Sequence, residues 1–419
     1  MKPYIALAVF AAATVLIAIA GNWNGDFVWD EGFWNDNLHL LEQHGFSTEF
    51  LLGMKDQAPG PLWQVIHWLA KPITQLHPGR MRLLNLALAI GVLGLLGRTI
   101  AQWKAVDHPH LTAFLTMCVP GIALMSGTAM TEIPTLLFAL GYVCLTVQYV
   151  LAPDRRTSHR LALAALAGIL LGVTVLSRAN FLAMAFATPC LIVLRRVRAD
   201  WRVVTIGSAI SLVVALAISG PVFRVWGGLV PPDVAGNAQL SVNWWNLVLT
   251  AFQLTAVVLV LSPTWFRASL REYFAWGSLG IVLLVINVTV GGVEHQSSTV
   301  STVLNRIGLG DSAGMLVARG TPALFMTYCG FFISRGIRYA FAHCRDVVPL
   351  FGFLIAAVLV AGTSIIPLNF GLRTSAQIAP FLAMALAPQV LSGRGSIPLK
   401  LLGLGLGNYY LWAQLAQWS

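Results

Sequence analysis

The feature that most constrains the fold of this chain is a series of long apolar runs that recurs from one end of the sequence to the other. A helix of about 20 apolar residues crosses the hydrocarbon core of a bilayer. The chain of 419 residues is 57% hydrophobic and only 10% charged, whereas a soluble domain carries about 25% charged residues. We therefore expect an all-α, polytopic integral membrane protein. The runs predict about thirteen spans, at residues 4–20, 82–100, 110–126, 132–150, 161–177, 180–194, 203–222, 246–262, 275–291, 319–334, 347–366, 374–391 and 398–415.

The basic residues lie in short clusters between the apolar runs, and alternate loops differ in how many they carry. When the loops are assigned alternately to two sides, one side holds 17 of the 26 lysine and arginine residues. The positive-inside rule places that side in the cytoplasm. The net charge of +10 follows from this topology and does not indicate a nucleic-acid partner. We expect a bacterial inner membrane with the other side facing the periplasm, and the endoplasmic reticulum lumen is the alternative.

We expect one transmembrane domain over residues 1–419, without a separate soluble domain. Its first outer loop is the longest and contains two amphipathic segments, near 33–45 and 61–77. Amphipathic helices beside a span lie in the membrane–water interface, which tryptophan also favours. The first apolar run resembles a signal peptide, and we interpret it as a retained anchor. The outer loops are residues 21–81, 223–245 and 292–318, and the tryptophans of the first are Trp23, Trp29, Trp34, Trp63 and Trp68.

Acidic residues on the outer side are the first candidates for catalysis. Asp30 and Glu31 directly follow the first span, where they can act as a general base, hold a cation or remain solvated. Glu132 lies at the outer end of another span, and a carboxylate at membrane depth is costly without a partner. The alternative for Glu132 is a first-turn acid that complements the helix dipole, with Thr131 as the cap.

Two arginines break the positive-inside pattern, because Arg178 and Arg373 lie in short outer turns. A guanidinium binds phosphate through two parallel hydrogen bonds, and fixed positive charge stabilises a departing phosphate. Snorkelling to lipid headgroups and an ion pair with Glu132 are the alternatives. Arg82 and Arg319 are further candidates of the same kind. These residues suit the transfer of a group from a phosphate.

Five local matches resemble motifs of the GT-C superfamily of membrane glycosyltransferases, and they occur in the family's order over most of the chain. Two are similar to the terminal glucosyltransferase of the N-glycan pathway, and one to the second acidic motif of protein O-mannosyltransferases and lipid A aminoarabinose transferases. The first looks like the first-loop acidic motif. The last resembles a late arginine motif, in which Thr374 replaces an aromatic residue. The matches are WDEGFW (29–34), QAPGPLW with RLLNL (57–63 and 82–86), TAMTEIPTLLF (128–138), LSRANFL (176–182) and GLRTSAQIAPFL (371–382).

The resemblance implies an inverting glycosyltransferase that moves a sugar from a polyprenyl-phosphate donor to a hydroxyl acceptor on the outer or lumenal face. Asp30 holds the position that the resemblance marks for the catalytic base. The alternative is that Asp30 caps a helix beginning near Phe33. Glu31 would orient the acceptor or share a cation, and Glu132 is the next acidic candidate. The donor phosphate would bind Arg373 and Arg178, with Arg82 and Arg319 as weaker candidates.

We expect no cofactor and no metal site of several ligands, because the histidines lack ligand spacing and the cysteines form no CxxC pair. A divalent cation at Asp30 and Glu31 stays open, since some members of the superfamily need one and others do not. The expected partners are membrane lipids, the lipid-linked donor, and a lipid-linked glycan, lipid or polysaccharide acceptor, without nucleic acid. Two other functions stay open, namely a transporter or flippase of lipid-linked sugars and a non-catalytic scaffold with a GT-C-like fold.

Overall fold

In the part of the chain that the structure describes, every regular element is a helix, as an all-α protein requires. The predicted first span, 4–20, lies outside the described residues apart from four isolated positions. Part of the predicted loop 292–318 is helical, because a helix begins at Asp311. The structure, a computed structural model, describes residues 26–27, 30–152, 155–195, 200–235, 244–290, 311–343, 346–363, 371–391 and 397–405, with positions 9, 12, 13 and 16.

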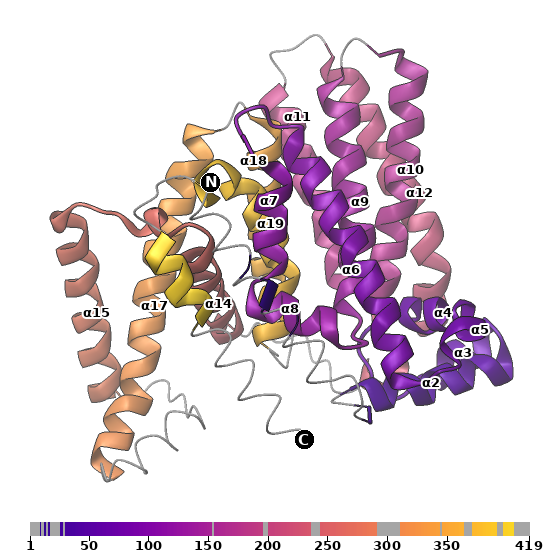
Figure 1. Cartoon of the computed structure of the whole chain (residues 1–419), viewed down its shortest axis with the longest axis horizontal. Helices are drawn as coiled ribbons and strands as arrows, with labels where there is room; N and C mark the ends of the chain where they lie inside the picture. The colour runs from indigo at the N-terminus through magenta and orange to yellow at the C-terminus, as the bar shows by residue number, and fades with distance from the viewer. Residues whose placement is uncertain are drawn as a thin grey trace.

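Four long apolar helices form a bundle and stand side by side in Figure 1. Each is long and apolar enough to cross a membrane. Helices α10 and α12 approach closely because Gly168 of α10 has no side chain, and a Cβ there would lie 2.5 Å from a backbone oxygen of α12. The bundle confirms that these apolar runs are helices. Its members are α6 (Pro78–Ala101), α9 (Glu132–Leu151), α10 (Thr157–Ser177) and α12 (Trp201–Trp226).

The predicted span 110–126 is broken into two helices. Helix α7 (Pro109–Met117) and helix α8 (Pro120–Gly127) meet at 73°. Pro120 explains the break, because proline lacks an N–H and disfavours helical backbone in the preceding residue. Val119 accordingly has extended backbone angles. The bend turns the end of α8 toward the start of α9.

The described residues contain five candidate spans, or six if the bent pair counts as one. The fifth lies in α15 (Leu270–Val290), which satisfies the criterion over Leu270–Asn287. The predicted count of about thirteen is therefore not confirmed. Several predicted runs form helices that are shorter or interrupted, such as α18 (Val347–Gly362) and the pair η1 (Ala179–Phe186) and α11 (Ala187–Arg195).

A second group of helices follows the bundle in the sequence. Helix α19 packs against α14 and α18, and also against α6 and α9 of the bundle, so it joins the two groups. Figure 1 shows α15 and α17 at the left of the molecule, away from α9, α10 and α12. The further members of this group are α14 (Trp244–Leu261), η2 (Pro263–Phe266), α17 (Asp311–Ala342) and α19 (Gly371–Val390).

The first outer loop forms a layer of short helices at one end of the bundle, at the lower right of Figure 1. Three of them overlap the two predicted amphipathic segments, and the helix Thr48–Gly53 lies between those segments. The expectation that the tryptophans lie in the interface is wrong for Trp34 and Trp63, which are buried and have ring centroids 5.7 Å apart. Trp68 is exposed, as expected. The helices are α2 (Glu31–His44), α3 (Thr48–Gly53), α4 (Leu62–Leu69) and α5 (Lys71–Thr74).

Candidate functional site

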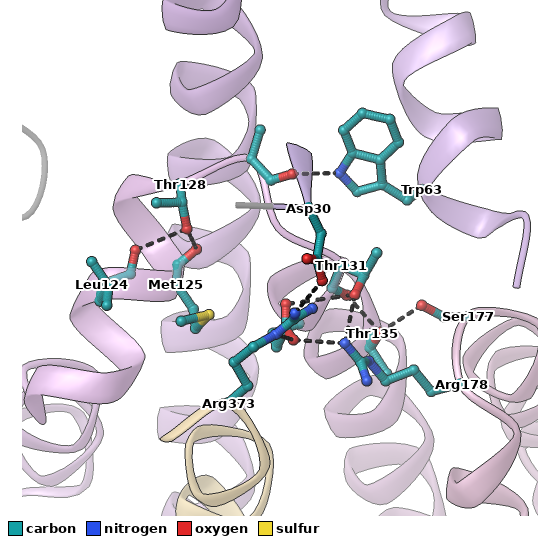
Figure 2. Close-up of polar contacts among 12 residues, drawn as sticks. Asp30, Trp63, Leu124, Met125, Thr128, Thr131, Thr135, Ser177, Arg178 and Arg373 are labelled. Carbon is teal, nitrogen blue, oxygen red and sulfur yellow. Dashed lines mark hydrogen bonds and ion pairs between the residues drawn. The ribbon is translucent and has the colours of Figure 1, made fainter. Parts of the chain in front are cut away.

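Two acids and two arginines from distant parts of the sequence meet at one end of the bundle. Arg373, in the first turn of α19, donates through Nε to Glu132 Oε1 at 2.6 Å and through Nη1 to Asp30 Oδ2 at 2.5 Å. Arg178, directly after α10, donates through Nη2 to the same oxygen of Glu132 at 2.6 Å. Figure 2 shows Arg373 and Arg178 reaching toward each other from opposite sides, with Asp30 above them. We call Asp30, Glu132, Arg178 and Arg373 the charged cluster.

The four side chains of the charged cluster differ in their access to solvent. Glu132 is fully buried, and Arg178 and Arg373 are mostly buried. The Asp30 side chain is 37% exposed. The formal charges of the cluster cancel, which limits the free-energy cost of burying them. Asp30 is therefore the member of the cluster that a solute can reach most easily.

Asp30 does not act as a helix cap. It occupies the N-cap position of α2, which begins at Glu31 rather than near Phe33, but its side chain makes no capping hydrogen bond. The Asp30 carboxylate instead contacts Arg373. The hydrogen bond that a capping role for the Asp30 side chain would require is therefore absent at the start of α2.

Glu132 is the first residue of α9, as the sequence suggested. The Thr131 side chain does not cap the helix. Its hydroxyl instead accepts a hydrogen bond from Arg178 Nη2 at 2.8 Å. Glu132 also complements the positive end of the α9 dipole. The ion pair that we considered as an alternative for the arginines is thus present, and it fixes both guanidinium groups next to Asp30.

Three side chains from separate segments hold the turn that precedes α9. Trp63 Nε1 donates to Ala129 O at 2.7 Å, a bond that Figure 2 draws. The Ala129 N–H donates to Glu31 Oε1 at 2.6 Å. Asn85 Nδ2 donates to Thr128 O. The predicted motifs around residues 29–34, 57–63 and 82–86 therefore meet at one backbone turn, and this turn places the first residue of α9.

Glu31 and Arg82 form a buried ion pair beside the charged cluster. Arg82 Nη2 donates to Glu31 Oε2 at 2.7 Å, and Arg82 Nε donates to Oε1 at 3.3 Å. Arg82 Nη2 also donates to Asp26 O at 2.6 Å. Both side chains are at most 3% exposed. The structure therefore shows Glu31 and Arg82 holding the backbone at Ala129 and Asp26.

The backbone around Arg178 is fixed by the first outer loop. The Gly60 N–H donates to Ser177 O at 2.8 Å, and the Ser177 hydroxyl contacts the Thr135 hydroxyl at 2.5 Å. The Arg178 N–H donates to Thr174 O. Arg178 Nε is buried and has no hydrogen-bond partner within the described ranges. One N–H of this guanidinium therefore remains available for an acceptor atom.

Trp34 is a site residue that the sequence did not single out. The Arg373 guanidinium lies over its ring, 5.3 Å from the centroid, and such a contact stabilises a cation. The sequence spacing could have identified Trp34 as a site residue, because Trp34 follows Asp30 by one helical turn. Side chains four residues apart share a helix face. The resemblance directed attention to the acids and not to this face.

The described residues contain no group of three or more His, Cys, Asp or Glu side chains that could hold a metal ion. The carboxylates of Asp30 and Glu31 contact arginines. Arg319 belongs to α17, and its side chain lies outside the described residues.

No family model matches the sequence, and no curated protein matches it. Two solved structures similar to this chain are ArnT and AglB, which are members of the GT-C superfamily. ArnT from Cupriavidus metallidurans bound to undecaprenyl phosphate has a TM-score of 0.42 and 14% identity, over 92% of this chain and 77% of that chain. AglB, an oligosaccharyltransferase from Archaeoglobus fulgidus, has a TM-score of 0.46 and 14% identity, over 99% of this chain and 56% of that chain.

Proposed function

We propose that the protein is an inverting glycosyltransferase of the GT-C type, which moves a sugar from a polyprenyl-phosphate donor to a hydroxyl acceptor at the outer face of the membrane. The observation that carries this proposal is the charged cluster, where a reachable carboxylate lies beside two arginines at the end of a transmembrane bundle. Glycosyl transfer from a lipid phosphate requires both parts, namely a base for the acceptor and positive charge for the leaving phosphate.

The donor phosphate binds between Arg178 and Arg373 in this proposal. Arg178 Nε has no partner within the described ranges and is available to a phosphate oxygen. Arg373 is planar and already spans two acceptors, Glu132 and Asp30, so it can exchange a carboxylate oxygen for a phosphate oxygen in the same plane. A phosphate at this position lets the polyprenyl tail remain in the bilayer beside the bundle.

Asp30 acts as the general base. When the phosphate takes the place of Asp30 at Arg373, the Asp30 carboxylate is released to accept the proton of the acceptor hydroxyl. The acceptor oxygen forms a bond to C1 of the sugar from the face opposite the phosphate. The bond between C1 and the phosphate oxygen breaks, and its electron pair goes to that oxygen. The product is an inverted glycoside, with the polyprenyl phosphate held by the two arginines.

Glu132 serves as a positioning residue, because both arginines bind the same oxygen atom of its buried carboxylate. Trp34 supports Arg373 from the side of its ring. No step of this scheme requires a divalent cation, since the arginines supply the positive charge at the phosphate. We therefore expect transfer to continue in the presence of EDTA.

A transporter or flippase of lipid-linked sugars is the main rival. Such a protein would move a charged headgroup through the bilayer, and acids in the middle of spans would serve that movement. In the five candidate spans that the structure describes, the acids lie only in the first turns. The middle of these spans therefore contains no carboxylate that could serve the movement of a headgroup.

The proposal is tested with purified protein and a panel of polyprenyl-phosphate sugars, measuring transfer and donor hydrolysis. Asp30→Asn should lower turnover of the accepted donor by roughly 10²–10⁴-fold while donor binding is kept. Asp36→Asn is the matched control, because Asp36 is an exposed acid of the same helix. Equal turnover in Asp30→Asn and wild type would refute the assignment of the base. Donor binding without turnover, for every donor and acceptor, would support the transporter or the scaffold.

A further inference from the structure

A cavity between α14, α15 and α17 is lined by none of the residues of the charged cluster. Its volume is about 810 Å³, within the range of about 300–1,000 Å³ that ligand sites occupy. Aromatic and aliphatic side chains line most of it. Several of them are also exposed at the surface of the protein, among them Tyr273, Ile281 and Leu324. The cavity therefore opens to the surroundings of the helices.

Helix α15 is a candidate membrane span whose apolar side chains are not buried by other helices of the described residues. None of the residues in its apolar stretch is buried, and its partner along the cavity is α17. Figure 1 shows this pair of helices at the left edge of the molecule. An apolar helix of this length is surrounded by hydrocarbon in a membrane, so the cavity beside it would face lipid chains there.

One end of the cavity has a basic rim, which we define as Arg267, Arg271, Arg335 and Arg338. Arg335 is held in place, because its Nε donates to Trp265 O at 3.1 Å and its Nη2 donates to Arg267 O. Arg338 is paired with Glu272. The two remaining arginines of the rim are exposed and have no acidic partner within the described ranges. The rim therefore carries an excess of positive charge next to an apolar cavity.

The basic rim lies at the end of the molecule opposite the charged cluster. Ser262, which precedes the rim by a few residues, donates to Gln389 near the end of α19 at 3.1 Å. Arg373 lies at the start of α19, 16 positions earlier. At 1.5 Å per residue the two points are about 24 Å apart along the helix. A lipid whose headgroup contacts the rim therefore cannot place that headgroup at Arg373.

We propose that this cavity binds an anionic phospholipid from the leaflet opposite the charged cluster, with an acyl chain in the cavity and its headgroup at Arg267 and Arg271. The positive charge of the basic rim selects an anionic headgroup. The apolar walls of the cavity select a hydrocarbon chain as the other part of the ligand. The site is separate from the proposed donor site and does not depend on the proposed function. Bound lipid would cover α15 and tie it to α14.

Trp276 provides a direct probe, because it lines the cavity. The purified full-length protein in dodecyl maltoside is titrated with phosphatidylglycerol or phosphatidylcholine, each brominated in its acyl chains, and tryptophan fluorescence is recorded. The signal of interest is the quenching that is lost in Trp276→Phe. We expect half-maximal quenching at a lower mole fraction of phosphatidylglycerol than of phosphatidylcholine. Each of Arg267→Gln and Arg271→Gln should weaken that preference by roughly five-fold.

Two glycine substitutions separate binding in the cavity from general contact with lipid. Gly277 lines the cavity, and a Cβ there meets no atom within 4 Å. Gly277→Phe should therefore occupy the part of the cavity next to Trp276 and reduce the Trp276-dependent quenching. Gly94→Phe is the matched control, because Gly94 is an exposed glycine of α6 with equally open space, and this variant should keep the quenching. Thermal unfolding confirms that each variant is folded.

Three outcomes would overturn the proposal. Equal quenching by the two lipids would show that the basic rim selects no headgroup. Quenching that is not reduced in Gly277→Phe would place the lipid outside the cavity. Absence of quenching by either lipid, together with a dimer in light scattering, would show that a second copy of the chain covers α15.

Discussion

Arg373 Nε and Glu132 Oε1 lie 2.6 Å apart, although 241 positions separate the two residues in the sequence. The bond joins the start of α19 to the start of α9. Arg373 also contacts Asp30 and Trp34 of the first outer loop, so it connects three parts of the chain. Because Glu132 also binds Arg178, a single carboxylate sets the spacing between the two guanidinium groups.

Removal of the Glu132 charge should destabilise the protein. Glu132→Gln leaves two mostly buried arginines with Asp30 as the remaining acid of the cluster, and breaking a buried ion pair from one side costs about 3–5 kcal/mol. We expect a clear fall in the thermal unfolding temperature of the detergent-solubilised protein. Asp30→Asn is the comparison, and it should cost less because Asp30 is partly exposed. Equal unfolding temperatures for the two variants would contradict the positioning role of Glu132.

The Glu31–Arg82 pair should act on catalysis through the turn before α9. Glu31 binds both Arg82 and the Ala129 N–H, so Glu31→Gln and Arg82→Gln disturb the same turn. We expect the two single variants to lower transfer by similar factors, and the double variant to be less harmful than the two effects added. A double-mutant cycle on unfolding should give a coupling of about 0.5–3 kcal/mol. A Glu31→Gln variant that is stable but inactive, beside an active Arg82→Gln, would make Glu31 a catalytic residue instead.

Gly60 should tolerate no side chain. Its N–H donates to Ser177 O, and a Cβ at Gly60 would lie 2.0 Å from Leu176 O. Gly60→Ala must therefore push the first outer loop away from the end of α10 and displace Arg178. We expect a loss of stability of about 1–3 kcal/mol together with weaker donor binding. Gly32→Ala is the matched control, since a Cβ there meets nothing within 4 Å. If both variants behaved like wild type, the contact would have no role in the site.

The sequence predicted the members of the charged cluster, but it gave the ion pair of the arginines with Glu132 only as one of several alternatives. Asp30, Glu132, Arg178 and Arg373 were each recognisable because charge is rare and costly at the ends of spans. Whether an arginine there binds an acid or a ligand depends on the packing of α9, α10 and α19, which a single sequence does not encode locally. The structure shows that both arginines contact the acid.

The buried tryptophans show a second limit of sequence reasoning. Trp34 and Trp63 have the composition of interfacial residues, and their amphipathic helices were predicted correctly. Their burial follows from how α2 and α4 pack against each other, a tertiary contact that periodicity does not reveal. The break at Pro120 was visible in the sequence and was outweighed by the continuous apolar run from 110 to 126.

His67 should make stability depend on pH. The imidazole is buried against Trp63, with ring centroids 4.2 Å apart, and neither of its nitrogens has a hydrogen-bond partner within the described ranges. Burial lowers the pKa of His67 from 6.5 to about 3, because desolvation disfavours the charged form. Between these two values the unfolded chain binds more protons than the folded one. The free energy of unfolding therefore falls as the pH drops below 6.5, and the contribution that this histidine makes above 6.5 is lost progressively down to about 3.

The measurement is the unfolding temperature of wild type and His67→Phe in detergent between pH 7 and 4.5. Two pH units below 6.5 correspond to about 3 kcal/mol in the free energy of unfolding. The unfolding temperature of wild type should therefore fall more steeply with decreasing pH than that of the variant. The phenyl ring keeps the contact with Trp63 and has no proton to bind. His77→Phe is the control, because His77 is exposed and its substitution should leave the slope unchanged. Parallel curves for wild type and His67→Phe would show that His67 is protonated in the folded protein as readily as in the unfolded chain.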